Sequence, residues 1–177
     1  MRSLAERIIR EAAVAAGLPA ERVGRKPEKE DKLAPSPRLE IEFLPEGLAR
    51  DYDKIARFPS VTRPGTHETI RERIYTRRLE VRAEVHAEDE EWQEEFVRRF
   101  LLALPARTAD ADNNLVRVEA FRATLGGFNK KFIEIFRKRA AALHLRFTGM
   151  LCRDEELPLI RDVNIKDGLT FKAAKEA

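Results

Sequence analysis

The most restrictive feature of the sequence is the alternation of apolar and polar residues from position 79 to 87, LEVRAEVHA. A period of two residues is the period of a β-strand with one buried and one solvated face. Strand-forming residues begin as early as Ile70, so the pattern predicts a strand of about 18 residues, whereas most strands have about five or six. A strand this long is expected to project beyond the fold or to bend at a bulge, and the rest of the chain has to be organised around it.

Two helices are expected beside this strand. The first covers about residues 4–16, with Ser3 and Glu6 in a capping-box pattern at its start and Gly17 at its end. The second begins after Asp89, which is a good N-cap, and acidic residues fill its first turn. Its apolar side chains recur every four residues and are Trp92, Phe96, Phe100 and Leu104. This stripe predicts packing against a sheet rather than a cofactor site.

Three further strands are expected at residues 37–45, 115–125 and 142–148, because apolar and polar residues alternate in each segment. Val163 and Ile165 predict one more edge strand near the C-terminus. With the long strand, these segments supply enough strands for one sheet.

Residues 128–141 allow two interpretations. We favour a strand at about 131–136 followed by a turn, because the segment FIEIF is aromatic and β-branched. A helix from 129 to 141 satisfies the spacing of the apolar residues equally well. Three segments without a sustained pattern, which we expect to form a flexible loop, an irregular excursion and a frayed tail, are residues 24–37, 46–69 and 167–177.

The length of 177 residues suits one domain, residues 1–177. The predicted fold class is α+β, with a single mixed or antiparallel β-sheet, two main helices packed on one face, and a long projecting strand or hairpin. The 34 basic and 31 acidic residues leave a net charge of only +3, which is not by itself the footprint of a nucleic-acid-binding protein. The single cysteine excludes an intramolecular disulfide, and the lack of a signal peptide or a long apolar run favours a protein of the cytoplasm.

The sequence contains no recognisable catalytic, cofactor-binding or metal-binding motif. The histidines His67, His86 and His144 lie far apart, and the last two are expected on polar strand faces, so we interpret them as exposed or satisfied surface residues. Cys152 has no evident activating neighbour and is expected to be a packed thiol. The loop at residues 110–114 begins with the spacing of a calcium loop but lacks the later glycine and glutamate. We therefore expect no catalytic residue, cofactor or metal, and no enzymatic activity.

The densest group of basic residues surrounds the first half of the long strand. As a candidate interface with a neighbouring subunit or another acidic partner, this group comprises Arg57, Arg63, Arg71, Arg73, Tyr75, Arg77 and Arg78. A solvated strand face with cross-strand charge pairs is the simpler interpretation of the same residues. A nucleic-acid-binding module is a further alternative, although a single tyrosine gives little support for base stacking.

The order of these elements resembles the tail terminators of tailed bacteriophages and prophages, the family that includes the minor tail protein U of lambda-like phages. The segments that carry the resemblance are IIREAAVAAGL, PRLEIEFLP, TRRLEVRAEVHAEDEEWQEEFVRRFLLALP and ALHLRFTG with the strand-forming tail after it. Together they cover most of residues 1–165. The excursion at 46–69 has no counterpart in the family that we can place.

The resemblance implies a structural virion protein that forms a homo-oligomeric, hexameric ring on the tail tube. Such a ring stops polymerisation of the tail tube protein and provides the surface for head–tail joining through a head-completion or neck protein. It also implies assembly in the host cytoplasm, a final location in the virion tail, no membrane, and no nucleic acid beyond DNA passing through the ring. Another head–tail neck or completion protein is the alternative within the same class.

Overall fold

The main β-sheet has seven strands and is mixed. Its strands are β1 (Val23–Arg25), β2 (Arg38–Phe43), β3 (Gly47–Pro59), β4 (His67–His86), β5 (Arg107–Ala109), β6 (Leu115–Thr124) and β7 (Ala140–Pro158). Their order is β1-β2-β4-β7-β6-β5, and β3 pairs with β4 outside this path. β1 is parallel to β2, whereas the pairs β2–β4, β5–β6 and β6–β7 are antiparallel. A separate antiparallel pair comprises β8 (Asp162–Asn164) and β9 (Thr170–Lys172).

The structure, a computed structural model, describes residues 1–27, 35–125, 140–160, 162–164 and 170–172. The chain divides into two compact units. Unit 1 comprises Met1–Ala49 and Thr76–Leu151, and unit 2 comprises Arg50–Tyr75 and Cys152–Ala177. The chain passes from one unit to the other within β3, β4 and β7. The two units thus share these three strands.

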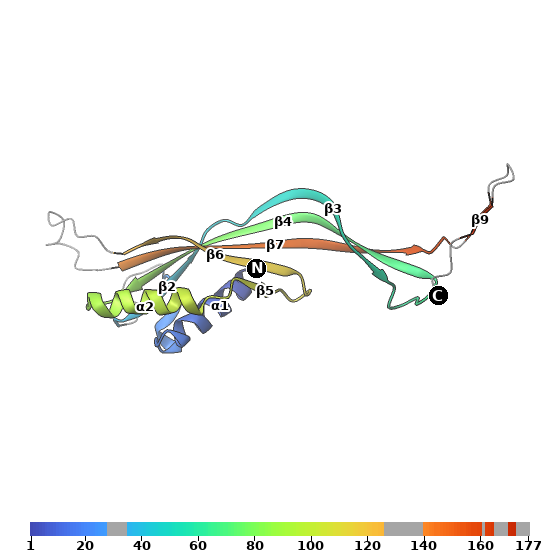
Figure 1. Cartoon of the computed structure of the whole chain (residues 1–177). Helices are drawn as coiled ribbons and strands as arrows, with labels where there is room; N and C mark the ends of the chain where they lie inside the picture. The colour runs from blue at the N-terminus through green and yellow to red at the C-terminus, as the bar shows by residue number, and fades with distance from the viewer. Residues whose placement is uncertain (28–34, 126–139, 161, 165–169, 173–177) are drawn as a thin grey trace. The chain divides into compact units, whose positions relative to one another are not determined.

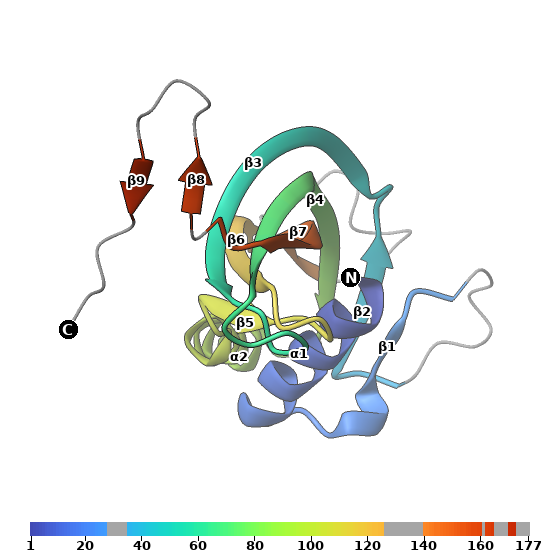
Figure 2. The ribbon, with the colours of Figure 1, turned by 90° about the vertical axis from the view of Figure 1, so that its right-hand side faces the viewer.

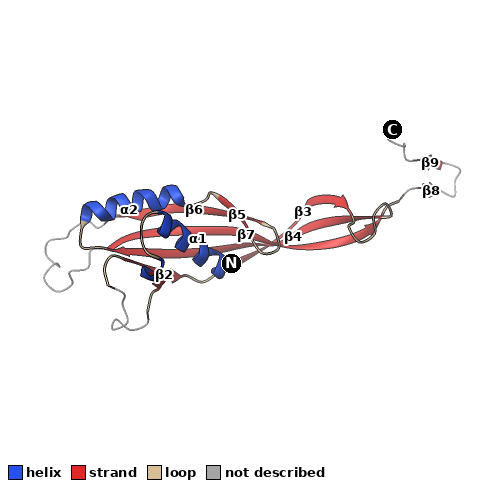
Figure 3. Cartoon of the chain, turned by 90° about the horizontal axis from the view of Figure 1, so that it is seen from below, coloured by secondary structure: helices blue, strands red, loops and turns tan. Residues whose placement is uncertain are grey.

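In unit 1, two helices lie on one face of the sheet. These are α1 (Arg2–Ala15) and α2 (Glu90–Ala103), and a short 3-10 helix, η1 (Ala20–Arg22), follows α1. Figure 1 shows both helices on the same side of the strands, and Figure 3 shows them on the side of the sheet that faces the viewer. In Figure 2 the two helices lie side by side. This arrangement confirms the predicted α+β class, one main sheet with two helices on one face.

The apolar core of unit 1 lies between these helices and the sheet. The alternation that predicts β4 is confirmed, because Leu79, Val81, Ala83 and Val85 are all buried in this core. Among the other fully buried side chains are Ile9, Phe96 and Phe100 from the helices and Leu39, Ile41, Leu143, Leu145 and Phe147 from the strands. Each such side chain is worth about 1.5–3 kcal/mol when it leaves water, so this layer accounts for most of the stability of unit 1.

The two helices begin differently. Asp89 caps α2 as predicted, and its side chain accepts hydrogen bonds from the backbone nitrogens of Glu91 and Trp92. The capping box predicted at Ser3 is wrong, because α1 already starts at Arg2 with Met1 in the cap position and has no side-chain cap. The apolar stripe predicts the helix correctly, but α1 begins two residues earlier than the cap pattern indicates.

The segment expected to be an irregular excursion, residues 46–69, is mostly regular. It contains the 13-residue strand β3 and the start of β4, and only a connection at residues 60–66 separates them. The alternation test missed β3 because almost all of its side chains are exposed, so no period of two marks a buried face. Its pairing with β4 makes it a strand.

Other expectations have mixed outcomes. The loop expected at 24–37 begins inside β1, and its part at 28–34 lies outside the described residues. The strand-or-helix question at 128–141 falls mostly on residues that are not described, while the strand expected at 142–148 is confirmed as part of β7. The predicted edge strand at Val163 is confirmed as β8. The tail expected to be frayed contains the strand β9, so that expectation is wrong over its three residues.

Unit 2 differs from unit 1 in how it is held together. All residues of the apolar core cluster belong to unit 1. Among the described side chains of unit 2, Ile70 is the one buried apolar residue, and Ser60 and Thr69 are buried polar residues. Unit 2 is therefore a ribbon built on β3, β4 and β7 that lacks a hydrophobic core of its own in its described part.

Candidate functional site

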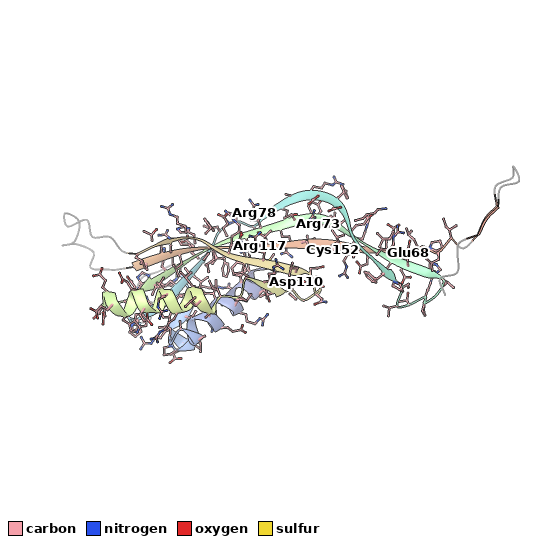
Figure 4. All side chains as sticks on the ribbon, viewed as in Figure 1. Glu68, Arg73, Arg78, Asp110, Arg117 and Cys152 are labelled. Atoms are coloured by element: carbon pink, nitrogen blue, oxygen red, sulfur yellow. The ribbon has the colours of Figure 1, made fainter. Side chains whose placement is uncertain are left out.

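The predicted basic group is distributed over both units. Its five members Arg57, Arg63, Arg71, Arg73 and Tyr75 belong to unit 2, and Arg77 and Arg78 belong to unit 1. Figure 4 labels Arg73 and Arg78 on β4, together with Glu68 near the start of that strand. Four of the six arginines in the group, Arg57, Arg71, Arg73 and Arg77, form ion pairs with acidic side chains of the chain.

In unit 2, β4 is tied to its neighbours by ion pairs. Arg71 donates hydrogen bonds of 2.7 Å from both Nε and Nη2 to the carboxylate of Asp154 on β7. Arg73 lies 2.8 Å from Asp51 and 3.3 Å from Asp53 on β3. The hydrogen bonds that Arg71 donates lower the pKa of Asp154. The simpler interpretation, a strand face with cross-strand charge pairs, describes these arginines well.

Two further ion pairs join strands of unit 2. Arg57 on β3 lies 3.4 Å from Glu68 on β4. Arg153 on β7 lies 3.0 Å from Glu72 on β4, with one hydrogen bond between them. Cross-strand charge pairs therefore join β4 to both β3 and β7.

The connection at residues 60–66 is also fixed to β7. Ser60 Oγ donates a 2.6 Å hydrogen bond to Glu156 Oε1, and the hydroxyl of Thr62 donates to the same oxygen. These two hydrogen bonds, that of Ser60 first, lower the pKa of Glu156. The backbone nitrogen of Leu159 donates to the carbonyl of Thr66 at 2.8 Å. Arg63, from the predicted group, lies in this connection, with Nη1 3.3 Å from a ring nitrogen of His67.

In unit 1, Arg77 and Arg78 have different surroundings. Arg77 Nε donates a 2.7 Å hydrogen bond to Glu46, and both side chains are largely buried. The next residue, Arg78, is exposed and makes no ion pair with any residue that the structure describes. Among the described residues, Arg78 and, in unit 2, Arg63 are the exposed arginines of the predicted group that form no ion pair with an acidic side chain.

Unit 2 exposes several apolar side chains, although few of its described side chains are buried. Val61 is 87% exposed and Ile160 is 77% exposed. The other large apolar side chains that are exposed in the described part of this unit are Tyr52, Ile55 and Leu159. Exposed apolar side chains also occur in unit 1, for example Leu102 and Leu115, so the distinguishing feature of unit 2 is that its described part buries one apolar side chain, Ile70, beside them.

A second group of polar residues was missed at the sequence level. Glu40 on β2 and Glu84 on β4 are directly opposite each other in the antiparallel register, and His86 lies two residues further along β4. All three are buried, with exposed fractions of 7%, 8% and 9%. The expectation that His86 is an exposed or satisfied surface histidine is therefore wrong. The alternation of apolar and polar residues identifies the polar face of a strand, but it does not show whether neighbouring side chains bury that face.

The remaining histidines, His67 and His144, and the cysteine Cys152 lie outside this group. His67 is satisfied as expected, since its ring nitrogens lie 3.0 Å from Thr66 Oγ1 and 3.3 Å from Arg63 Nη1. His144 packs against the ring of Phe121, and Cys152 is half-buried.

The loop at residues 110–114, which resembles the start of a calcium loop, is organised by its own first residue. Asp110 accepts hydrogen bonds from the backbone nitrogens of Asp112 and Asn114, and Figure 4 labels Asp110 at the start of this loop. The spacing of the aspartates is thus explained by a turn.

Comparisons with known proteins add no family. No protein-family model matches the chain, and no curated protein matches it either. Within the part of the chain that the structure describes, neither helix is long and apolar enough to cross a membrane.

Proposed function

We propose that the chain is a structural, non-enzymatic subunit of a bacteriophage or prophage tail, and that it acts as a tail terminator. In this role, copies of the chain close into a ring at the end of the tail tube, stop its polymerisation and present a surface to a head-completion protein. A ring of this kind requires two different surfaces on each subunit that fit each other and close. The assembly part of the proposal rests on unit 2, and its assignment to a phage tail rests on the sequence resemblance.

The observation that carries the assembly role is the combination of exposed apolar side chains and internally neutralised charges in unit 2. The arginines Arg57, Arg71 and Arg73 are paired with acidic side chains of the same unit, so they are not free to bind a strongly acidic polymer. The apolar side chains of Val61 and Ile160 are 87% and 77% exposed, so they are open to contact with another molecule. Surfaces of this composition are typical of protein–protein contacts.

The same pairing weighs against the nucleic-acid-binding alternative. Affinity for DNA depends on basic side chains that can replace the counterions of the phosphates. In the predicted basic group, Arg71 is held by two hydrogen bonds to Asp154 and Arg77 by one to Glu46. A salt titration of DNA binding tests this alternative, and tight binding that weakens steeply with salt would favour it.

The experiment that tests the assembly surface compares variants of exposed apolar residues. Tyr52→Ser and Val61→Ser remove exposed apolar groups from unit 2, and Leu102→Ser removes a 75% exposed group from α2 in unit 1. The mass of each variant is measured by analytical ultracentrifugation, alone and with tail tube protein. We expect the two unit 2 variants to assemble less than the wild type, and Leu102→Ser to assemble normally.

All three variants are expected to unfold at about the temperature of the wild type, because exposed side chains contribute little to stability. Normal assembly of both unit 2 variants would contradict the proposed surface. An equal loss in Leu102→Ser would show that the effect is not specific to unit 2.

A further inference from the structure

The buried group Glu40, Glu84 and His86 in unit 1 has an arrangement that the tail role does not explain. Glu40 and Glu84 are cross-strand partners on β2 and β4. They lie on the polar face of these strands, since the adjacent residues Leu39, Ile41 and Val85 are in the apolar core. Like charges directly opposite each other in a sheet destabilise it, and more so when they are buried. A positive charge close to both carboxylates would offset this repulsion.

Arginines neutralise one oxygen of each carboxylate. Arg38 Nε lies 2.7 Å from Glu40 Oε1, and Arg82 Nη2 lies 2.7 Å from Glu84 Oε1. These contacts fix the orientation of both carboxylates. The remaining oxygens, Oε2 of each, are directed toward the imidazole of His86.

His86 lies between these two free oxygens without being satisfied by either. Its Nε2 is 3.4 Å from Glu40 Oε2 and 3.7 Å from Glu84 Oε2. Neither ring nitrogen has a hydrogen-bond partner, although both atoms are inaccessible to solvent. Leaving a buried polar group unpaired costs on the order of 1–3 kcal/mol, so an arrangement of this kind calls for a further ligand of the nitrogen.

The distances fit a metal ion of the size of Zn²⁺. Zinc binds nitrogen and carboxylate oxygen at about 2.0–2.2 Å in a tetrahedron, whose ligand atoms are then roughly 3.3–3.6 Å apart. The two distances from His86 Nε2 are close to this range, and all three ligand atoms lie within 4.8 Å of one another. The three atoms would have to move closer together to enter the first coordination sphere of one ion.

Protonation of the imidazole is a less favourable way to supply the positive charge. Burial lowers the pKa of His86, and this effect outweighs the nearby Glu40, which acts in the opposite direction. The neutral imidazole is the form that coordinates a metal. Besides Arg38 and Arg82, a third nearby cation is Lys26, whose Nζ lies 3.5 Å from Glu84 Oε2 on an exposed side chain. Lys26 would compete with a metal for that oxygen.

We propose that Glu40, Glu84 and His86 form a binding site for a divalent transition-metal ion of the zinc type, with the fourth position filled by water. Imidazole and carboxylate ligands suit Zn²⁺ and its neighbours in the first transition series. Arg38 and Arg82 act in the second shell, where they orient the two carboxylates. The bound ion would join β2 to β4 across the register at which their two glutamates meet.

The test uses the full chain, freed of metal with EDTA, and measures binding of Zn²⁺ by competition with a chromophoric chelator. Co²⁺ serves as a second probe, because its visible absorption reports four-coordinate geometry. We expect one ion per chain. We also expect more than about 100-fold weaker binding in His86→Gln and in Glu84→Gln, since even second-shell changes cost 10- to 100-fold. His144→Gln, which alters a histidine of β7 outside the group, is expected to bind as the wild type does.

Lys26→Gln provides a variant that should fold normally, because the lysine is on the surface. Removal of the competing ammonium is expected to tighten Zn²⁺ binding. Several results would overturn the proposal: no saturable binding below about 1 mM Zn²⁺, unchanged or weaker binding in Lys26→Gln, or binding that survives in His86→Gln. Equal loss in His144→Gln would also overturn it, because the ion would then be bound elsewhere.

Discussion

Arg71 on β4 and Asp154 on β7, 83 positions apart in the sequence, are joined by two parallel hydrogen bonds of 2.7 Å. This bidentate geometry is the strongest form of an arginine–carboxylate contact. It lies in unit 2, where Ile70 is the one buried apolar side chain among the described residues. In the described part of this unit, charge pairs and backbone hydrogen bonds hold the strands together, whereas unit 1 has an apolar core.

The first prediction concerns the titration of Asp154. Its folded-state pKa lies below the ordinary 3.8 because of Arg71. The stabilisation from this carboxylate is therefore fully present above about pH 3.8 and is lost as the pH falls through the lower, folded-state pKa. Arg71→Gln is expected to move the pKa of Asp154 back toward 3.8, as measured by NMR titration of the side-chain carboxyl carbon.

The control for this titration is Arg117→Gln, which breaks an exposed pair with Glu119 in unit 1. It should leave the pKa of Asp154 where it is in the wild type. If the titration midpoint of Asp154 were the same in Arg71→Gln as in the wild type, the bidentate contact would have no role in stabilising the carboxylate.

The second prediction tests the core of unit 1. Phe100 is completely buried, and its ring stacks on Phe96 with 6.0 Å between the centroids. Phe100→Ala is expected to lower the free energy of unfolding by about 3–5 kcal/mol, because it removes a large side chain and leaves a cavity. Leu102→Ala, on the same helix but 75% exposed, should change it by less than about 0.5 kcal/mol. Urea denaturation followed by circular dichroism measures both, and similar losses would contradict the described packing.

The third prediction compares how much Asp89 at the start of α2 and Ser3 at the start of α1 contribute to stability. Asp89→Ala removes a side chain that accepts two backbone hydrogen bonds at the start of α2, and it should cost about 1 kcal/mol. Ser3→Ala alters a residue that the sequence pattern marks as a cap but that makes no cap bond in α1. It is therefore expected to be nearly neutral in the same urea experiment. If Ser3→Ala lost as much free energy of unfolding as Asp89→Ala, the predicted capping box at Ser3 would be correct after all.

The fourth prediction concerns the basic group as an interface. Arg78 is exposed and has no ion pair among the described residues, so Arg78→Glu should leave the stability unchanged and weaken assembly. Arg73→Glu is the contrasting variant, because it places an acid beside Asp51 and Asp53 and should destabilise unit 2. Thermal unfolding and sedimentation of both variants distinguish the two effects. Full assembly of a folded Arg78→Glu protein would remove this residue from the interface.

The sequence predicts those parts of the fold in which one face of an element is apolar. The alternation at 79–87 and the stripe of α2 indicate burial directly, and Leu79 and Phe100 are fully buried as expected. β3 could not be predicted in this way, because its side chains are almost all exposed and it owes its conformation to pairing with β4. Propensity and periodicity carry little information about such a strand.

The candidate sites were also only partly predictable, because they depend on contacts between strands that are distant in the sequence. The arginines of the basic group are evident in the sequence, but their partners, such as Asp154, come from strands distant in the chain. The group around His86 has no sequence signature, since Glu40 meets Glu84 only through the register of β2 and β4. Two glutamates on the polar faces of two predicted strands would have indicated it only if that register had been known.

The proposed role as a ring-forming tail terminator is tested most simply by the mass of the wild-type protein with and without tail tube protein. Analytical ultracentrifugation of the chain alone and of the mixture, with electron microscopy of the tubes, measures both assembly and capping. We expect a closed ring, hexameric by the resemblance, either in free solution or on the ends of tubes whose growth has stopped. A chain that remains a monomer in both samples, while the tubes grow as they do without it, would rule out this role.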